Sequence, residues 1–175
     1  MKVLIEFIGD YMSKKLTWIE KLETMIPGFS GYKKRELIRE DDRLIRSYVV
    51  DLLSDARRNL EEAAASILDF DFKLARRIED LISNVRLTID KLRYSEAGYA
   101  PHYSRIHIEL PDLKKVRDID GKLVELAEEI KELSVKVLRS AKVSTVKNEV
   151  ILRINEVLSK INDVIDRRIK VFKGV

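Results

Sequence analysis

The sequence contains no cysteine, only three prolines, six glycines and two histidines among 175 residues. The absence of cysteine excludes disulfide bonds, cysteine nucleophiles and thiolate zinc sites, so a metal site would have to use His, Asp and Glu. It also fits a reducing compartment, and we expect a cytoplasmic protein. Because proline and glycine interrupt helices, their scarcity favours long, unbroken helices.

Long apolar runs are absent as well. No window reaches the roughly 18 charge-free apolar residues that a membrane-spanning helix requires, and no secretory leader pattern opens the chain. We therefore expect no membrane span.

Charged residues are abundant: 34 Lys and Arg against 30 Asp and Glu give a formal net charge of +4, with both signs interspersed. This composition is typical of solvated, ion-paired helices, and it also occurs in proteins of thermophiles. The modest positive excess is compatible with nucleic-acid binding but lacks the dense basic stripe typical of it. A chain of this length can bury the core of one domain, and we expect a single domain over residues 1–175.

Apolar residues recur every three or four positions in five segments of the chain. The predicted helices cover residues 2–25 and 33–68. A third follows the hinge at 69–72, with its seam from Leu74 to Leu92, a fourth opens at Pro111-Asp112 and ends before the turn at 140–145, and a last helix follows Ser144 as N-cap. Pro27 and Gly28 stop the first helix, and the Asp-Phe repeat at 69–72 supplies a carboxylate N-cap for the third. These heptad-like seams predict an all-α fold, an elongated four- to five-helix bundle with coiled-coil packing, in which the last two helices form an antiparallel hairpin.

One long irregular connector interrupts this pattern at residues 95–112. Within it, residues 105–110 alternate apolar and polar side chains and are compatible with a short strand. Such a strand would serve as an edge for another chain or as a strap laid across the bundle. Connectors of this length are more often functional than short ones.

Two groups of residues resemble those of a known set of proteins. The first is Pro27-Gly28-Phe29-Ser30-Gly31-Tyr32-Lys33 followed by Arg35-Glu36-Leu37-Ile38-Arg39-Glu40, and the second is Arg93-Tyr94 with Gly98-Tyr99-Ala100. Their order along nearly the whole chain is similar to that of small prokaryotic all-helical proteins with a proline-glycine/glycine-tyrosine connector, an Arg/Glu-rich helix start and a later glycine-tyrosine loop. The resemblance implies the helical architecture and a role for both segments, and it implies no chemistry. Pro101-His102-Tyr103 departs from the apolar residues that follow the glycine-tyrosine pair in those proteins.

The segment 27–46 combines permissive glycines, aromatic residues and many charges. The interaction or anion-binding candidates are Phe29, Gly31, Tyr32, Lys33, Lys34, Arg35, Arg39, Arg43 and Arg46, together with Tyr94, Tyr99 and Tyr103 near the later connector. Four of the arginines are three or four residues apart and share a helix face that would suit a phosphate or an acidic partner. The alternative, which we favour, is an internal ion-pair network, because four carboxylates lie among these cations and would repel a polyanion.

His102 and His107, with Glu109 close by, are weak candidates for a metal site. In an extended segment the two histidines point to opposite faces, so we favour a surface or structural role for them. No phosphate-binding loop, dinucleotide fingerprint, nucleophile elbow or zinc-protease motif is present. We expect no catalytic residue, no metal and no cofactor.

The C-terminal turn is basic, with Arg167, Arg168, Lys170 and Lys173. These cations suit a nucleic acid or an anionic lipid surface. They also complement the negative end of the helix dipole, which is the interpretation we favour.

No motif in the sequence indicates a reaction, and we therefore favour a non-enzymatic protein. We expect a helical-bundle interaction or scaffold protein that forms a homo-oligomer or binds a protein partner through segments 27–46 and 95–112. Two alternatives stay open. One is a nucleic-acid- or ribosome-associated basic helical protein, and the other is a ligand- or metal-binding helical protein that uses the 95–112 loop.

Overall fold

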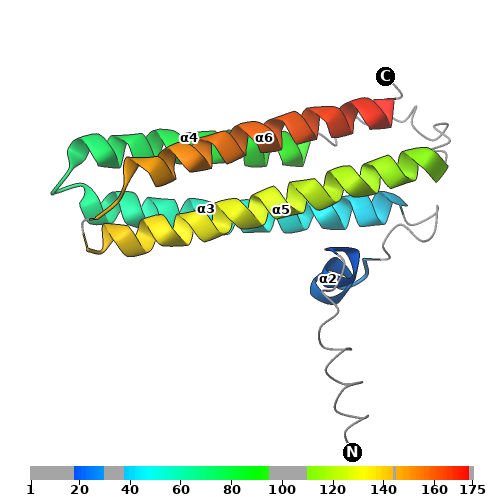
Figure 1. Cartoon of the computed structure of the whole chain (residues 1–175), viewed down its shortest axis with the longest axis horizontal. Helices are drawn as coiled ribbons and strands as arrows, with labels where there is room; N and C mark the ends of the chain where they lie inside the picture. Colours follow the sequence, from blue (N-terminus) through cyan, green and yellow to red (C-terminus); the bar gives the residue numbers. More distant parts are fainter. Residues whose placement is uncertain (1–17, 30–37, 95–109, 144, 174–175) are drawn as a thin grey trace, which may run out of the picture. The chain divides into compact units, whose positions relative to one another are not determined.

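The structure, a computed structural model, describes residues 18–29, 38–94, 110–143 and 145–173 (Figure 1). These residues form five helices and no strand: α2 (Trp18–Met25), α3 (Ile38–Ile67), α4 (Phe72–Tyr94), α5 (Leu110–Ala141) and α6 (Asn148–Lys173). The expected all-α fold is confirmed for this part of the chain. Within it, no helix combines the length and the low charge needed to cross a bilayer.

Some predicted boundaries differ from those of the structure. Of the predicted helical residues, 2–17 and 33–37 lie outside the described part of the chain, as do residues 105–109 of the expected strand. Leu110, expected at the end of that strand, is the first residue of α5. Helix α6 begins at Asn148 and not directly after Ser144, because the amide of Thr145 donates to the carbonyl of Ser140, 2.9 Å away, and completes the preceding turn.

The chain divides into two compact units, Met1–Leu44 and Ile45–Val175. In the first unit, α2 ends at Met25, and the amide of Phe29 donates to the carbonyl of Ile26 at 3.2 Å. Gly28 has a φ of +87°, a left-handed conformation that a residue with a Cβ resists. The predicted helix stop at Pro27 and Gly28 is therefore confirmed.

The second unit contains two helical hairpins. In the first hairpin, the carbonyl of Ile67 at the end of α3 accepts hydrogen bonds from the amides of Phe70 and Asp71. A carboxylate oxygen of Asp71 then accepts the amide of Leu74 at 2.9 Å, so the predicted N-cap of α4 is confirmed. In the second hairpin, Arg153 of α6 forms a 2.7 Å ion pair with Glu129 of α5. The expected antiparallel pairing of the last two helices is thus also confirmed.

Ion pairs and hydrogen bonds between the hairpins give the order of the helices around the second unit. Helix α3 is joined to α5, and α4 is joined to α6, by contacts that advance in the same direction along both partners. They are Asp55–Lys131 (2.7 Å), Glu62–Lys142 (2.9 Å), Arg77–Asn148 (2.9 Å) and Lys91–Asp166 (2.9 Å). The helices of each pair are therefore parallel, as Figure 1 shows, and the cyclic order is α3, α4, α6, α5.

Helix α5 buries most of the heptad seam that its sequence predicts. The spacing places Val116, Ile119, Leu123, Leu126, Ile130, Leu133 and Val137 on the seam, and all are buried except Ile119 and Leu133, which are partly buried. The positions with at most 2% exposure are Val116, Asp120, Leu123, Ala127, Ile130, Ser134, Val137 and Ala141. A prediction based on hydrophobicity leaves Asp120 and Ser134 out of the core. Polar side chains are buried only when a hydrogen-bond partner is available to them.

Four buried polar residues of this unit have such a partner on a neighbouring helix: Thr88, Asp120, Ser134 and Arg168. Asp120 accepts a 2.6 Å hydrogen bond from Nε of Arg168, and Ser134 accepts one of 3.0 Å from the amide of Asn59. On the other side of the bundle, the hydroxyl of Thr88 accepts a 3.3 Å bond from Asn162. These contacts link α5 to α6, α3 to α5, and α4 to α6.

Candidate interaction surface

The two hairpin turns of the second unit expose large apolar side chains. Phe70 and Phe72 are 79% and 63% exposed, and Leu68 and Val143, which lie just beyond the ends of α3 and α5, are exposed as well. We call these four side chains the apolar tip. Large apolar side chains are usually buried, and a cluster of them at a surface marks an interaction site.

Both turns lie at the same end of the second unit (Figure 1). The ion pair between Glu62 and Lys142 joins the last turns of α3 and α5, and the hydrogen bond between Arg77 and Asn148 joins the first turns of α4 and α6. The apolar tip is therefore one surface built from two turns.

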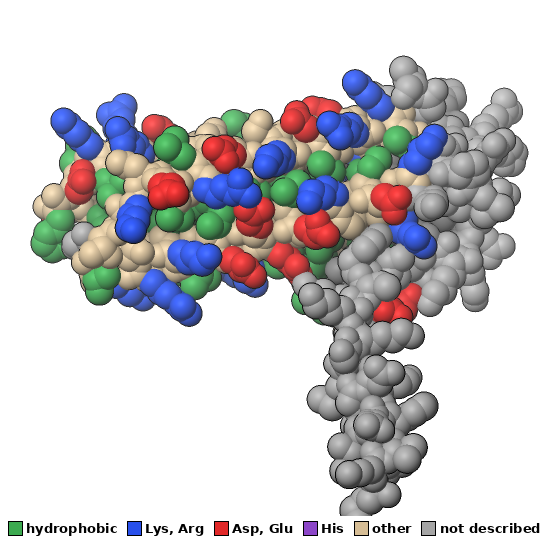
Figure 2. Space-filling view, in the orientation of Figure 1, with side chains coloured by type: hydrophobic (Ala, Val, Ile, Leu, Met, Phe, Trp, Pro, Cys, Tyr) green, Lys and Arg blue, Asp and Glu red, His purple; other side chains and the backbone are tan. Residues whose placement is uncertain are grey.

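Positive charge surrounds the apolar tip. The turns and adjoining helix ends, residues 68–77 and 139–149, contain six Lys or Arg and three Asp or Glu, which gives a net charge of +3. Two of the six cations are bonded, Arg77 to Asn148 and Lys142 to Glu62. The others are exposed and have no ion pair or hydrogen bond within the described residues; we call these the tip cations, Lys73, Arg76, Arg139 and Lys147. Figure 2 shows hydrophobic and basic side chains together at this end, on the left.

The sequence predicts Phe70 and Phe72 only as parts of a hinge and misses their exposure. The seam of α4, whose buried residues include Ala75, Ile78 and Ile82, gives no signal of this exposure. Phe72 lies three residues before Ala75, so a helical period would place its ring on the buried face. The structure instead leaves it 63% exposed at the first residue of α4.

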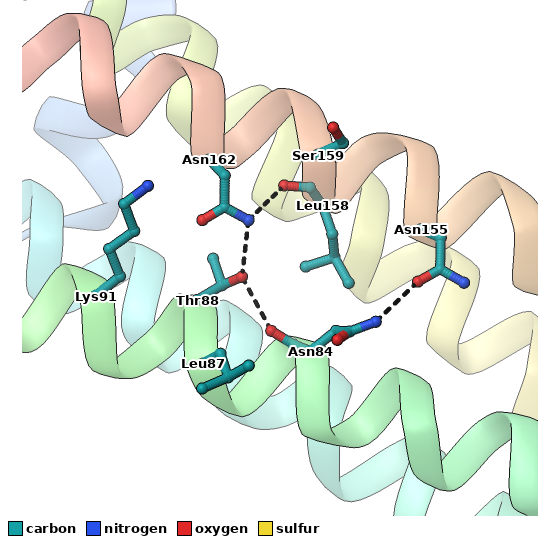
Figure 3. Close-up of a pocket in the computed structure, with 8 residues that line it drawn as sticks. All are labelled: Asn84, Leu87, Thr88, Lys91, Asn155, Leu158, Ser159 and Asn162. Atoms are coloured by element: carbon teal, nitrogen blue, oxygen red, sulfur yellow. Dashed lines mark hydrogen bonds between the residues drawn. The ribbon is translucent and has the colours of Figure 1, made fainter.

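A second feature is a groove of about 390 Å³ between α4 and α6 (Figure 3). It is lined by Asn84, Leu87, Thr88, Lys91, Asn155, Leu158, Ser159 and Asn162. Asn84 donates to the side-chain oxygen of Asn155 at 3.3 Å, and the Thr88 hydroxyl donates to the carbonyl of Asn84 at 3.0 Å. Because these groups bond across the helix pair or within a helix, the groove is better explained as a helix-pairing seam than as a ligand site.

The predicted site residues are only partly within the described chain. Outside it lie Gly31, Tyr32, Lys33, Lys34, Arg35, Tyr99 and Tyr103, the metal candidates His102, His107 and Glu109, and the side chain of Arg39. In the first unit Phe29 is buried and Arg43 is exposed. In the second unit Arg46 is buried, and Tyr94, at the opposite end of α4 from Phe72, is exposed. None of these residues belongs to the apolar tip.

The basic C-terminal turn is not one exposed cluster. Arg168 is buried and paired with Asp120, whereas Arg167 and Lys170 are exposed. The side chain of Lys173 lies outside the described residues. Arg168 therefore pairs with a carboxylate inside the bundle, whereas from the sequence alone we explain it by the helix dipole.

One pairing between α3 and α5 has a clear electrostatic effect. The hydrogen bond from Lys131 holds the pKa of Asp55 below its usual 3.8, against a smaller opposing effect of partial burial. This pair stabilises the bundle away from the apolar tip.

Within the described residues, no three His, Asp or Glu side chains are grouped so that they could hold a metal ion. No family model, no curated protein and no solved structure matches the chain. The apolar tip and the tip cations are therefore identified from the fold and the side chains alone.

Proposed function

We propose that this chain is a non-enzymatic binding protein whose second unit presents the apolar tip to a partner protein. The observation that carries the proposal is the exposure of Phe70 and Phe72 at one end of the bundle. Aromatic side chains are enriched among the residues that supply most of the binding energy of an interface, and they cluster at its centre.

The bundle supports this role because it holds the tip in place. Both turns are closed by backbone hydrogen bonds, and the Asp71 cap fixes the start of α4 next to Phe72. A surface that is ordered before binding loses little conformational entropy when a partner docks.

Photocrosslinking tests the proposal. A photoreactive phenylalanine analogue at position 70 or 72 of the full chain should give a discrete adduct with one partner protein, identified by mass spectrometry. The matched control is the same analogue at position 87, because Leu87 is also exposed but lies away from both turns. Absence of adducts at 70 and 72, or the same adducts at 87, would contradict the proposal.

A nucleic acid is the second candidate partner, because the tip cations next to aromatic rings suit a single strand. Fluorescence anisotropy with a single-stranded oligonucleotide should then show binding at about 50 mM salt that weakens steeply by about 200 mM. No binding at the lower salt would remove this candidate.

Self-association through segments 27–46 and 95–112 stays a prediction, since most of these residues lie outside the described chain. Light scattering of the full chain measures it directly.

A further inference from the structure

We infer that the partner of this surface is a protein with an apolar pocket edged by Asp and Glu side chains. The inference rests on the proposed function and specifies the chemistry of its partner. It follows from the arrangement of apolar, cationic and anionic groups at the hairpin turns.

The charge around the apolar tip selects an acidic partner. The tip cations come from three helix ends: Lys73 and Arg76 from α4, Arg139 from α5 and Lys147 from the residue before α6. They lie on the helix ends that adjoin the exposed rings, and none of them forms an ion pair within the described residues. An apolar centre with a charged rim is the usual anatomy of a protein interface, and complementary rim charges speed association and exclude wrong partners.

The same charge disfavours a second copy of this chain at the tip. A symmetric dimer places the same surface of both copies face to face, so a net charge of +3 would meet +3. Like charges brought together across an interface cost several kcal/mol in general.

Two carboxylates disfavour a lipid bilayer and a nucleic acid. Asp69 is exposed and directly precedes Phe70, and Asp71 lies between the phenylalanines. Insertion of both rings among lipid headgroups, or stacking on bases, would bring these carboxylates next to phosphates. The Asp71 carboxylate is bonded to the amide of Leu74. A protein pocket can accept the rings, leave Asp69 in water and place its own acidic side chains against the tip cations at the rim, away from Asp69.

The test uses the full chain labelled with ¹⁵N and four probes in separate titrations followed by NMR. The probes are a helical peptide of alternating Glu and Leu pairs, its counterpart with Lys in place of Glu, vesicles containing anionic phospholipid, and a single-stranded oligonucleotide. We expect the Glu-Leu peptide to shift resonances of residues 68–77 and 139–149, with binding at least about tenfold tighter than for the other three probes.

Three double variants, one of them a control, separate the inference from the proposed function. Lys73→Glu with Arg76→Glu should weaken the Glu-Leu peptide about tenfold or more, whereas Lys160→Glu with Lys170→Glu, two exposed cations of α6, should change it less than about twofold. Phe70→Ser with Phe72→Ser should abolish the resonance shifts.

The outcomes are distinguishable. Tighter binding of the Lys-Leu peptide, the vesicles or the oligonucleotide, or no effect of the charge reversal, would overturn the acidic-partner inference while leaving a binding tip intact. If Phe70→Ser with Phe72→Ser binds every probe with the affinity of the unmodified chain, both the proposed function and the inference are contradicted.

Discussion

At the scale of single residues, the Asp120–Arg168 pair has the largest energetic consequences. Both side chains are almost completely buried, at 0% and 5% exposure, and lie between α5 and α6. Taking two charges out of water costs several kcal/mol, which their attraction offsets only when the geometry is good. The pair is therefore better explained as a contact that fixes the register of this hairpin than as a source of net stability.

Removing one partner of this pair should strongly lower the free energy of unfolding, whereas replacing both partners with apolar residues should lower it much less. Asp120→Ala should lower the free energy of unfolding by about 3–5 kcal/mol, because it removes the buried carboxylate that accepts the 2.6 Å hydrogen bond of Arg168. Asp120→Leu combined with Arg168→Met should recover most of that loss, since apolar residues of similar volume avoid the desolvation cost. Urea unfolding followed by circular dichroism measures both.

The control for this experiment is the exposed Lys122–Glu125 pair of the same helix. Lys122→Ala should change the free energy of unfolding by less than about 1 kcal/mol. If Asp120→Ala also lowered the free energy of unfolding by less than about 1 kcal/mol, removal of the carboxylate would not destabilise the core, and this explanation of the pair would be wrong.

The Asp55–Lys131 pair should give stability that depends on pH. The folded state holds the pKa of Asp55 below 3.8, so the pair stabilises fully above that pH and loses its effect as the pH falls through the lowered pKa. Lys131→Met should therefore reduce the free energy of unfolding by at most about 1 kcal/mol near neutral pH, and by progressively less below about pH 4. Urea midpoints at several pH values measure the difference, and an equal deficit at every pH would argue against this assignment.

At the scale of helices, polar contacts decide which elements are neighbours. Apolar seams on four amphipathic helices would allow several packing orders. The part-buried contacts Asn59–Ser134 and Thr88–Asn162 each join two particular helices at one register. A polar group at a seam position specifies pairing because any other partner leaves it unsatisfied.

A double-mutant cycle should detect this coupling between α4 and α6. Thr88→Val and Asn162→Leu should show a coupling free energy of about 0.5–1.5 kcal/mol in urea unfolding, because each removes one partner of the 3.3 Å hydrogen bond. Ser83 is a matched control, since the one partner of its hydroxyl among the described residues is the carbonyl of Glu79 in its own helix. Ser83→Ala should not couple to Asn162→Leu. Equal coupling in both cycles would refute a specific contact.

These contacts also explain what the sequence could and could not predict. Helix existence, the Asp71 cap and the stop at Gly28 follow from local rules about period, capping and backbone freedom. The α5 seam was partly missed because burial of Asp120 depends on Arg168, 48 residues away. The apolar tip was missed for a similar reason: only the packing of the hairpins brings Val143 to the same end as Phe70.

At the scale of the whole molecule, the proposed binding function depends on the second unit keeping both hairpin turns at one end. The described chain contains a bundle with an ion-paired surface along its length, where Leu87 and Leu152 are also exposed, and with four exposed apolar side chains at the end where both turns meet. The sequence prediction of an interface rests on segments 27–46 and 95–112. Residues 30–37 of the first and 95–109 of the second lie outside the described residues. The apolar tip is a separate candidate that the described residues support by themselves.

A distance measurement tests most directly whether the two turns share one end. Spin labels at positions 70 and 143 of the full chain, measured by pulsed electron paramagnetic resonance, should lie within about two helix diameters, roughly 20 Å. If the second turn were at the opposite end of the bundle, the separation would approach the length of α3, roughly 45 Å. The shorter distance is the predicted result, and the longer one would contradict the existence of a single tip surface.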